Sequence, residues 1–129
     1  MELSAKDLRI GNKIGIWYKD EYKNIHEVEP TTFYMINGDI DSKGFYFKAI
    51  PLTEDWLLKA DGYWEDIISE KDAFLIDIHE ELSIGWCGYL FLVISGCIIQ
   101  INDTNSIYVH QLQNLYSDLK GEELTFKND

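Results

Sequence analysis

The clearest hydrophobic pattern in the chain lies near its C-terminus, between residues 109 and 120. Its apolar residues recur at i, i+3, i+4 and i+7, the spacing of one side of an α-helix: Leu112, Leu115, Tyr116 and Leu119. Lys120 followed by Gly121 is typical of a helix end. A helix this short is marginal alone in water. We therefore predict that it packs on the rest of the protein and buries Leu112 and Leu115.

The first part of the chain shows short runs rich in β-branched and aromatic residues, as strands do. Four runs are predicted strands: Lys13–Tyr18, Tyr22–Val28, Thr31–Ile36 and Phe45–Ala49. Two turn signals, Asn37-Gly38 and Asp41–Gly44, leave open whether a tight hairpin or a longer loop precedes the fourth. Ser4 and Asp7 resemble the cap of a single helical turn.

A short central helix is predicted after Thr53. Thr53 is a natural N-cap, and Glu54 and Asp55 fall in the first turn, where the helix dipole favours acidic residues. Asp61-Gly62 ends this helix. The segment from Glu65 to Asp72 has too few apolar residues to set a period, so its structure is left open.

The second half continues with further strands. Ala73–Ile78 and Leu82–Cys87 are predicted strands, and Tyr89–Ile94 with Cys97–Ile101 form the most apolar pair. Because both sides of this pair are apolar, we predict that its strands are central and covered on both faces. Thr125-Phe126 is a candidate segment to dock back onto the fold.

Length and composition favour one compact domain spanning residues 1–129. Four Trp, eight Tyr and six Phe are too many for a disordered chain. The predicted fold is α+β: a mostly antiparallel sheet or SH3-like half-barrel, one short central helix, and a C-terminal helix packed on the sheet.

The sequence favours a cytoplasmic protein. Its first residues are polar and acidic, unlike a signal peptide, and no apolar segment approaches the roughly 18 residues of a membrane span. If Ser95-Gly96 is a tight turn, Cys87 lies well beyond the pairing of Cys97. We therefore expect two free thiols, as in a reducing compartment.

Recognisable catalytic and metal-binding motifs are missing from the sequence. His26, His79 and His110 do not fit a metal-ligand spacing, and there is no Gly-rich phosphate loop or Gly-x-Ser-x-Gly motif. Glu80 and Glu81 follow His79, but adjacent strand residues point to opposite faces, so at most two would converge on a metal. We expect no enzyme activity, no cofactor and no metal.

The negative charge is concentrated in one stretch. The net charge is −12, and residues 54–81 hold ten acidic residues against two basic ones, a net charge of −8. Such a stretch is either a solvated face or a surface that docks on a basic groove. Tyr63 and Trp64 lie inside this stretch, and aromatics among charges are typical of interfaces, which slightly favours docking. The alternative is that these two side chains pack beneath the short central helix. The candidate partner-binding residues are Tyr63, Trp64, Glu65, Asp66, Glu70, Asp72, Asp77, Glu80 and Glu81.

Three segments together resemble a family of short phage and prophage proteins from Bacteroidetes-type bacteria. They are Leu8–Asn12, Ile50–Lys59, and Val109–Tyr116 with Gly121–Leu124, about a quarter of the chain. Family members usually carry Thr or Ala between Ser117 and Lys120, which this chain lacks. Residues 63–107, which include most of the acidic stretch, match nothing in the family. The resemblance implies no catalytic residues, and it implies a phage accessory role in the cytoplasm of a host cell.

Two functions follow as hypotheses. The first is an anti-CRISPR-like inhibitor whose acidic surface binds a basic protein partner, such as a guide-RNA-loaded nuclease. The alternative is a phage structural or adaptor protein that acts through protein–protein contacts. A small-ligand or catalytic protein has the least support. Direct non-specific binding to nucleic acid is disfavoured, because such affinity depends on Lys and Arg contacts to phosphates.

Overall fold

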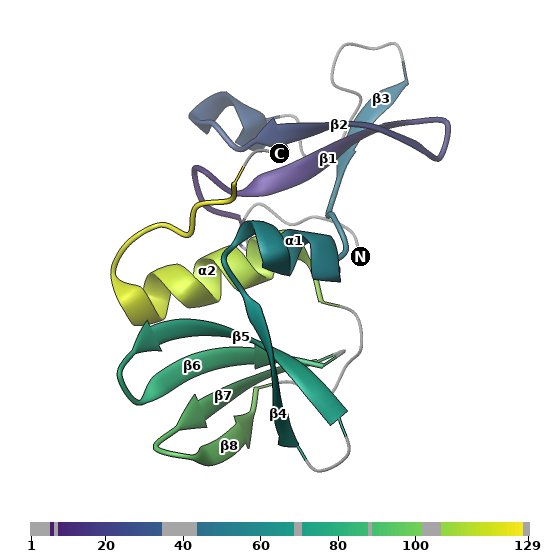
Figure 1. The fold of residues 1–129 in the computed structure, drawn as a ribbon. Helices are drawn as coiled ribbons and strands as arrows, with labels where there is room; N and C mark the ends of the chain where they lie inside the picture. Colours follow the sequence, from purple (N-terminus) through teal and green to yellow (C-terminus); the bar gives the residue numbers. More distant parts are fainter. Residues whose placement is uncertain are drawn as a thin grey trace. The chain divides into compact units, whose positions relative to one another are not determined.

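The computed structural model describes residue 6 and residues 8–34, 44–68, 71–87, 89–101 and 107–127 (Figure 1). The elements are β1 (Lys13–Tyr18), β2 (Glu21–Glu27), the 3-10 helix η2 (Pro30–Tyr34), β3 (Phe45–Lys48), α1 (Glu54–Lys59), β4 (Tyr63–Ile68), β5 (Lys71–His79), β6 (Leu82–Trp86), β7 (Leu90–Ile94), β8 (Cys97–Gln100) and α2 (Val109–Lys120). Two antiparallel sheets with two α-helices make an α+β fold, which confirms the predicted class.

The chain groups into two compact units. The first comprises residues 1–50 and 108–114, and the second comprises residues 51–107 and 115–129. The helix α2 therefore contributes its first half to one unit and its second half to the other. That the whole chain acts as one domain stays a prediction.

The first unit is built on a three-stranded sheet with the order β2-β1-β3. Its core consists of apolar side chains from the sheet and the segments beside it: Leu8, Ile14, Val28, Phe47 and Ala49. Burial of these residues removes apolar surface from water, which is the main force that holds such a small sheet together.

Polar side chains of α2 hold the turn that precedes β1. Gln113 Oε1 accepts a hydrogen bond from the Lys13 backbone N–H at 2.7 Å, and Gln113 Nε2 donates to the Gly11 carbonyl at 3.2 Å. Asn12, which is buried, donates from Nδ2 to Asn114 Oδ1 at 2.9 Å. Two of the segments that carry the family resemblance are thus joined by hydrogen bonds. In this chain they perform a structural task.

The second unit is built on a five-stranded antiparallel sheet with the order β4-β5-β6-β7-β8. The helix α1 contacts β5, and Lys120 of α2 donates from Nζ to the Ile78 carbonyl at 2.7 Å. The C-terminal segment docks back as predicted, since the Phe126 ring meets Trp56 edge-on at 5.0 Å between centroids.

The two faces of this sheet differ, and we name each after one residue of β5. The Phe74 face includes Phe74, Ile76, Ile84, Leu92 and Ile99, and the Leu75 face includes Leu75, Asp77, Ser83, Gly85 and Phe91. Gly62 places α1 beside the Phe74 face, because a Cβ there would lie 2.8 Å from the Leu57 carbonyl oxygen and 3.1 Å from the Phe74 ring.

On the Leu75 face, the fully buried Phe91 ring lies over Gly85. A Cβ on Gly85 would stand 2.2 Å from two ring carbons of Phe91, so this position has room only for glycine.

One predicted strand proves to be a 3-10 helix. The prediction of a strand over Thr31–Ile36 is wrong for residues 31–34, which belong to η2, and residues 35 and 36 lie outside the described part. The cause is local hydrogen bonding after Glu29. The Thr32 hydroxyl accepts the Glu29 backbone N–H at 3.0 Å, and the Thr32 N–H donates to the Glu29 carbonyl. A hydroxyl that closes such a turn competes with strand formation.

The prediction that the most apolar strand pair is central is wrong for its second member. The strand β8 ends the order of the five-stranded sheet, and all four of its residues are exposed. Leu115 was also expected to be buried but is only half-buried, whereas Leu112 is fully buried. The buried residues of α2 all lie in its N-terminal half. The apolar pattern therefore predicted which side of the helix packs, but not how deeply each residue is buried.

The remaining predictions concern the central helix, the segment after it, two turns and the cysteines. The central helix starts at Glu54 as expected, but the Thr53 side chain makes no capping hydrogen bond. The open segment between Glu65 and Asp72 belongs to strands β4 and β5, with residues 69 and 70 outside the described part. The predicted N-terminal turn at Ser4 and the turn at 37–38 also lie outside it. The predicted free thiols, Cys87 and Cys97, are confirmed.

Candidate functional site

The acidic stretch begins with α1, and its remaining part forms one end of the five-stranded sheet. We call β4, β5 and the β5–β6 turn the acidic end. Among the predicted binding residues, the structure describes the side chains of Tyr63, Asp77, Glu80 and Glu81. The other five predicted residues have side chains outside the described part: Trp64, Glu65, Asp66, Glu70 and Asp72. The backbone register sets Glu65 opposite Ala73 and Asp66 opposite Asp72.

Three side chains on the Leu75 face form a hydrogen-bonded group. The Tyr63 hydroxyl donates to Asp77 Oδ1 at 2.7 Å, and the Ser83 hydroxyl donates to the same oxygen at 2.9 Å. Tyr63 is 39% exposed, and Asp77, to which it is hydrogen-bonded, is also exposed. The group therefore fixes an aromatic ring and a carboxylate in one orientation at the surface.

Ser83 was not predicted from the sequence. It joins the group because β5 and β6 pair with Asp77 opposite Ser83. The Leu-Ser-Ile alternation around Ser83 did indicate a strand, but only the register shows which residue it faces.

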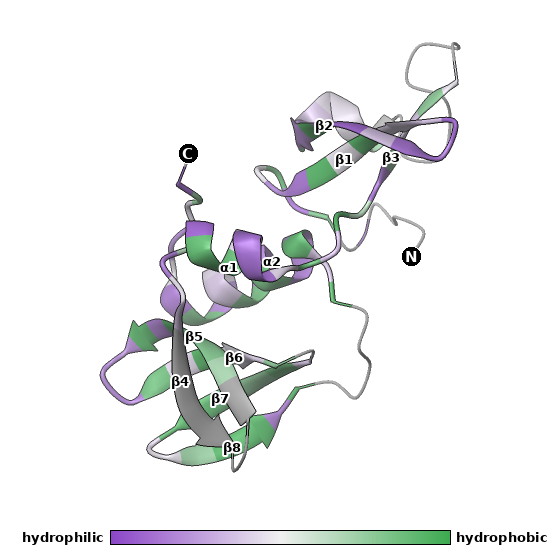
Figure 2. Ribbon diagram, turned by 45° about the vertical axis from the view of Figure 1, so that its right-hand side comes forward, coloured by the Kyte–Doolittle hydropathy of each residue, from purple (hydrophilic) through white to green (hydrophobic). Residues whose placement is uncertain are grey.

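Two further carboxylates extend the acidic end at the β5–β6 turn, where Glu80 and Glu81 are both exposed. This turn is held by the β7–β8 turn beside it. Ser95 donates its backbone N–H to the Glu81 carbonyl at 2.9 Å and its hydroxyl to Glu81 Oε2 at 3.0 Å. Figure 2 shows hydrophilic colour at the β5–β6 turn next to hydrophobic strands.

The chemistry of this arrangement suits binding. Asp77 is exposed and accepts hydrogen bonds from two neutral hydroxyl groups at one oxygen, Oδ1, and a carboxylate can also accept hydrogen bonds from a cation. The Ser83 hydroxyl donates to a carboxylate, whereas serine nucleophiles are normally activated by an imidazole. The histidines sit on separate elements, with His26 hydrogen-bonded to Thr32 at 2.9 Å and His110 buried in α2.

The described residues contain no group of three or more His, Cys, Asp or Glu side chains placed to hold a metal ion. In the same part of the chain, every helix is too short or too polar to cross a membrane.

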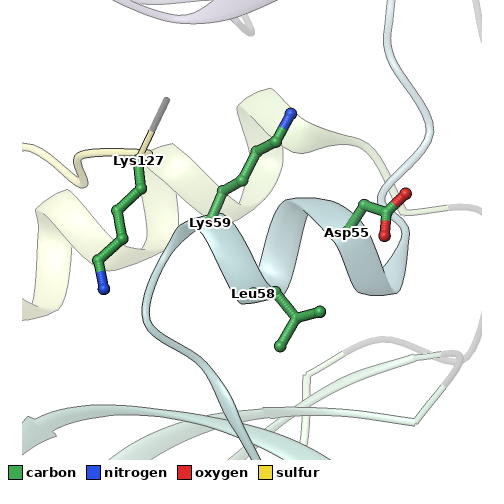
Figure 3. A pocket seen from close by; sticks show the side chains of 4 residues that line it. All are labelled: Asp55, Leu58, Lys59 and Lys127. Atoms are coloured by element: carbon green, nitrogen blue, oxygen red, sulfur yellow. The ribbon is translucent and has the colours of Figure 1, made fainter. Parts of the chain in front are cut away.

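The second unit also has a shallow hollow of about 300 Å³ beside α1. Its lining residues are Asp55, Leu58, Lys59 and Lys127, and Figure 3 shows their side chains extending in different directions. Lys127 is paired with Asp61, and Lys59 Nζ lies 5.1 Å from the centroid of the Trp56 ring. The charged groups do not converge on a common point, so the hollow lacks the features of a ligand site.

Comparison with known proteins gives no relative. No protein-family model matches the sequence, and neither a curated protein nor a solved structure shows significant similarity to it.

Proposed function

We propose that the chain is a non-enzymatic accessory protein that binds a basic surface of a partner protein through its acidic end. The observation that carries the proposal is the hydrogen-bonded group of Tyr63, Asp77 and Ser83, which displays an oriented aromatic ring beside a carboxylate. Preformed groups lose little side-chain freedom on binding, and this favours affinity.

The charge of the surrounding segment supports the same proposal. Residues 54–81 carry a net charge of −8, and Glu80 and Glu81 are exposed. A negative surface accelerates encounter with a positive one and selects it against other partners. A basic groove that normally holds nucleic acid offers the complementary potential. A guide-RNA-dependent defence nuclease of a Bacteroidetes-type host is the specific partner class we propose, and phage protection is the role.

The test uses two matched pairs of adjacent, exposed glutamates. Glu80→Lys with Glu81→Lys changes the acidic end, and Glu122→Lys with Glu123→Lys makes the same charge change in the segment that follows α2. Both double variants are compared with the unmodified protein in target-DNA cleavage by a guide-RNA-loaded CRISPR nuclease and in pull-down of that complex. Melting temperatures verify that each variant is folded.

The acidic-end pair is expected to lower affinity at least about tenfold, because it removes two attractions and adds two repulsions at the contact. The control pair is expected to change affinity less than about twofold. Affinity should also fall as salt rises, since screening weakens attraction between exposed charges. Equal losses from both pairs would show that only overall charge matters, and would contradict the proposed site.

The alternative function, a phage structural or adaptor protein, is favoured by a different feature. Residues 82–101 contain no Asp, Glu, Lys or Arg, and they form the strands β6, β7 and β8. An adaptor would use such a surface for a stable contact. In that case both double variants keep their contacts, and the nuclease is not inhibited.

A further inference from the structure

One row of side chains across the five-stranded sheet is buried at β5 and β6 and exposed at β8. On the Phe74 face, the row runs through Ile76, Ile84, Leu92 and Ile99, which are paired in turn. Ile76 and Ile84 are 4% and 1% exposed, Leu92 is half-buried, and Ile99 is 51% exposed. The helix α1 contacts β5, at the buried end of the row. The same apolar face is thus covered at one end and open at the other.

Ile99 has apolar neighbours on the open part of this face. Ile94 is 39% exposed and lies on the Phe74 face together with the exposed Cys97. Ile101, which follows β8, is 42% exposed, and its N–H donates to the Leu90 carbonyl at 3.0 Å, which continues the pairing and sets it on the same face. We call Ile94, Cys97, Ile99 and Ile101 the isoleucine patch. Isolated exposed apolar residues are normal, but adjacent ones on a terminal strand mark an interaction surface.

The charge of the chain indicates what covers the isoleucine patch. It lies within residues 82–101, which carry no Asp, Glu, Lys or Arg in a chain with a net charge of −12. A basic partner would be drawn to the acidic end. Two copies of this chain repel each other over most of their surface, and an uncharged surface is where they can meet with the least repulsion.

The position of the patch at the terminal strand β8 also fits contact with a second copy of the chain. Natural sheets usually protect a terminal strand from association with another chain by means of Lys, other charged residues or Pro. The strand Cys97–Gln100 has none of these. Two identical patches related by a two-fold axis are complementary to each other by symmetry, and such a contact closes after two copies.

We propose that the isoleucine patch binds the same patch of a second copy, giving a two-fold symmetric dimer. The contact extends the apolar core of each sheet by burying Ile99, Ile94 and Ile101 against their symmetry mates. The strands β4 and β5 of the acidic end are separated from β8 by β6 and β7, so both copies keep Tyr63 and Asp77 accessible. The β5–β6 turn, whose Glu81 is hydrogen-bonded to Ser95, lies at the border of the patch. A dimer would then present two acidic surfaces to partners.

The test measures molar mass by light scattering and sedimentation over a range of concentrations. The unmodified chain of 15.1 kDa is expected to approach twice that mass as concentration rises. Raising the salt concentration should strengthen the dimer, because salt screens the repulsion between two acidic copies. This is opposite to the salt dependence expected for binding of a basic partner, so the two proposals can fail independently.

The deciding variant is Ile99→Lys, with Leu58→Lys as its matched control. Leu58 is 49% exposed on α1, so the control places the same charge at an equally exposed apolar site of the same unit. Ile99→Lys should raise the dimer dissociation constant at least about tenfold, because it buries a charge in an apolar contact. It also makes the chain less negative, so weaker association cannot result from added repulsion. The control should dimerise like the unmodified chain.

Circular dichroism establishes that each variant is folded, and Ile94→Lys decides the outcome if Ile99→Lys does not fold. The proposal is supported if the patch variants lose the dimer while the Leu58→Lys control keeps it. A monomer at all concentrations, a dimer that survives the patch variants, or open-ended assemblies in place of a dimer would each overturn it.

Discussion

The two ends of the five-stranded sheet have opposite character although they share one fold. The acidic end begins at β4 and includes exposed carboxylates and a hydrogen-bonded tyrosine. The other end, β6 to β8, has no formal charge and exposes isoleucines. The β5–β6 and β7–β8 turns join through Ser95 and Glu81. Strand order thus sets β4 and β5 apart from β8, while the two surfaces meet at these turns.

This difference separates the forces that stabilise the fold from those available for binding. Burial of Phe91, Ile84 and Leu90 contributes mainly to stability, since fully burying one such side chain is worth about 1.5–3 kcal/mol. Exposed carboxylates contribute little to stability, so they are available for binding a partner. Substitutions at each end test this division.

The largest effect is expected from Phe91→Ala. Phe91 is fully buried on the Leu75 face between Leu75 and its neighbours, and removing the ring leaves a cavity. The free energy of unfolding should fall by about 3–5 kcal/mol. Urea denaturation followed by tryptophan fluorescence measures it. A loss below about 1 kcal/mol would show that the uncharged end is not part of the core.

A smaller effect is expected from Gly85→Ala. The new Cβ would stand 2.2 Å from the Phe91 ring, so the ring must move from its packed position. Such overpacking typically costs about 1–3 kcal/mol. The same denaturation assay applied to Gly85→Ala, Phe91→Leu and the double variant tests the cause. If the ring is responsible, the double variant should lose less stability than the two single losses added together.

The elements that local patterns define were predictable from the sequence. The stripe ending at Lys120-Gly121 gave α2, and Glu54-Asp55 after Thr53 gave the start of α1. The exposed position of β8 was not predictable, because a hydrophobic run reports that a strand is apolar and not whether another element covers it. The 3-10 helix was missed because one Thr32 hydroxyl outweighed the strand propensity of its neighbours.

The candidate site was predictable only as a stretch of acidic sequence. Its charge follows from composition, and the exposed Glu80 and Glu81 lie within it. The pairing of Asp77 with Ser83 and Tyr63 depends on strand register, which is set by turns and burial along the whole hairpin. Asp77 therefore has a structural partner that the sequence does not reveal.

At the acidic end, Tyr63→Phe should lower the free energy of unfolding by about 0.5–1.5 kcal/mol, the usual contribution of one hydrogen bond. The variant removes the hydroxyl that donates to Asp77 and keeps the ring. Ser83→Ala removes the second donor to the same oxygen and serves as the comparison. A loss as large as that of Phe91→Ala would mean that the acidic end is part of the core, contrary to the division proposed here.

The smallest effect concerns an exposed ion pair in the first unit, which sets the scale for surface charge in this protein. Lys13 Nζ lies 2.7 Å from Glu27 Oε1, and the hydrogen bond and positive charge of Lys13 hold the pKa of Glu27 below its ordinary value. A lowered pKa in the folded state gives stability above the ordinary pKa of the carboxyl group. That stability is lost as the pH falls through the lowered pKa.

Glu27→Gln should therefore destabilise the protein at pH 7 by only about 0.2–0.5 kcal/mol, because the Glu27 side chain is 60% exposed and solvent screens the pair. At pH 3 the difference between variant and unmodified protein should shrink, as it should in high salt. Glu80→Gln is the counterpart at the acidic end, where Glu80 has no ion pair within the described part of the chain. We expect no loss of stability from Glu80→Gln at either pH. A clear loss there would show that the exposed carboxylates support the fold, and the contrast between the two ends of the sheet would not hold.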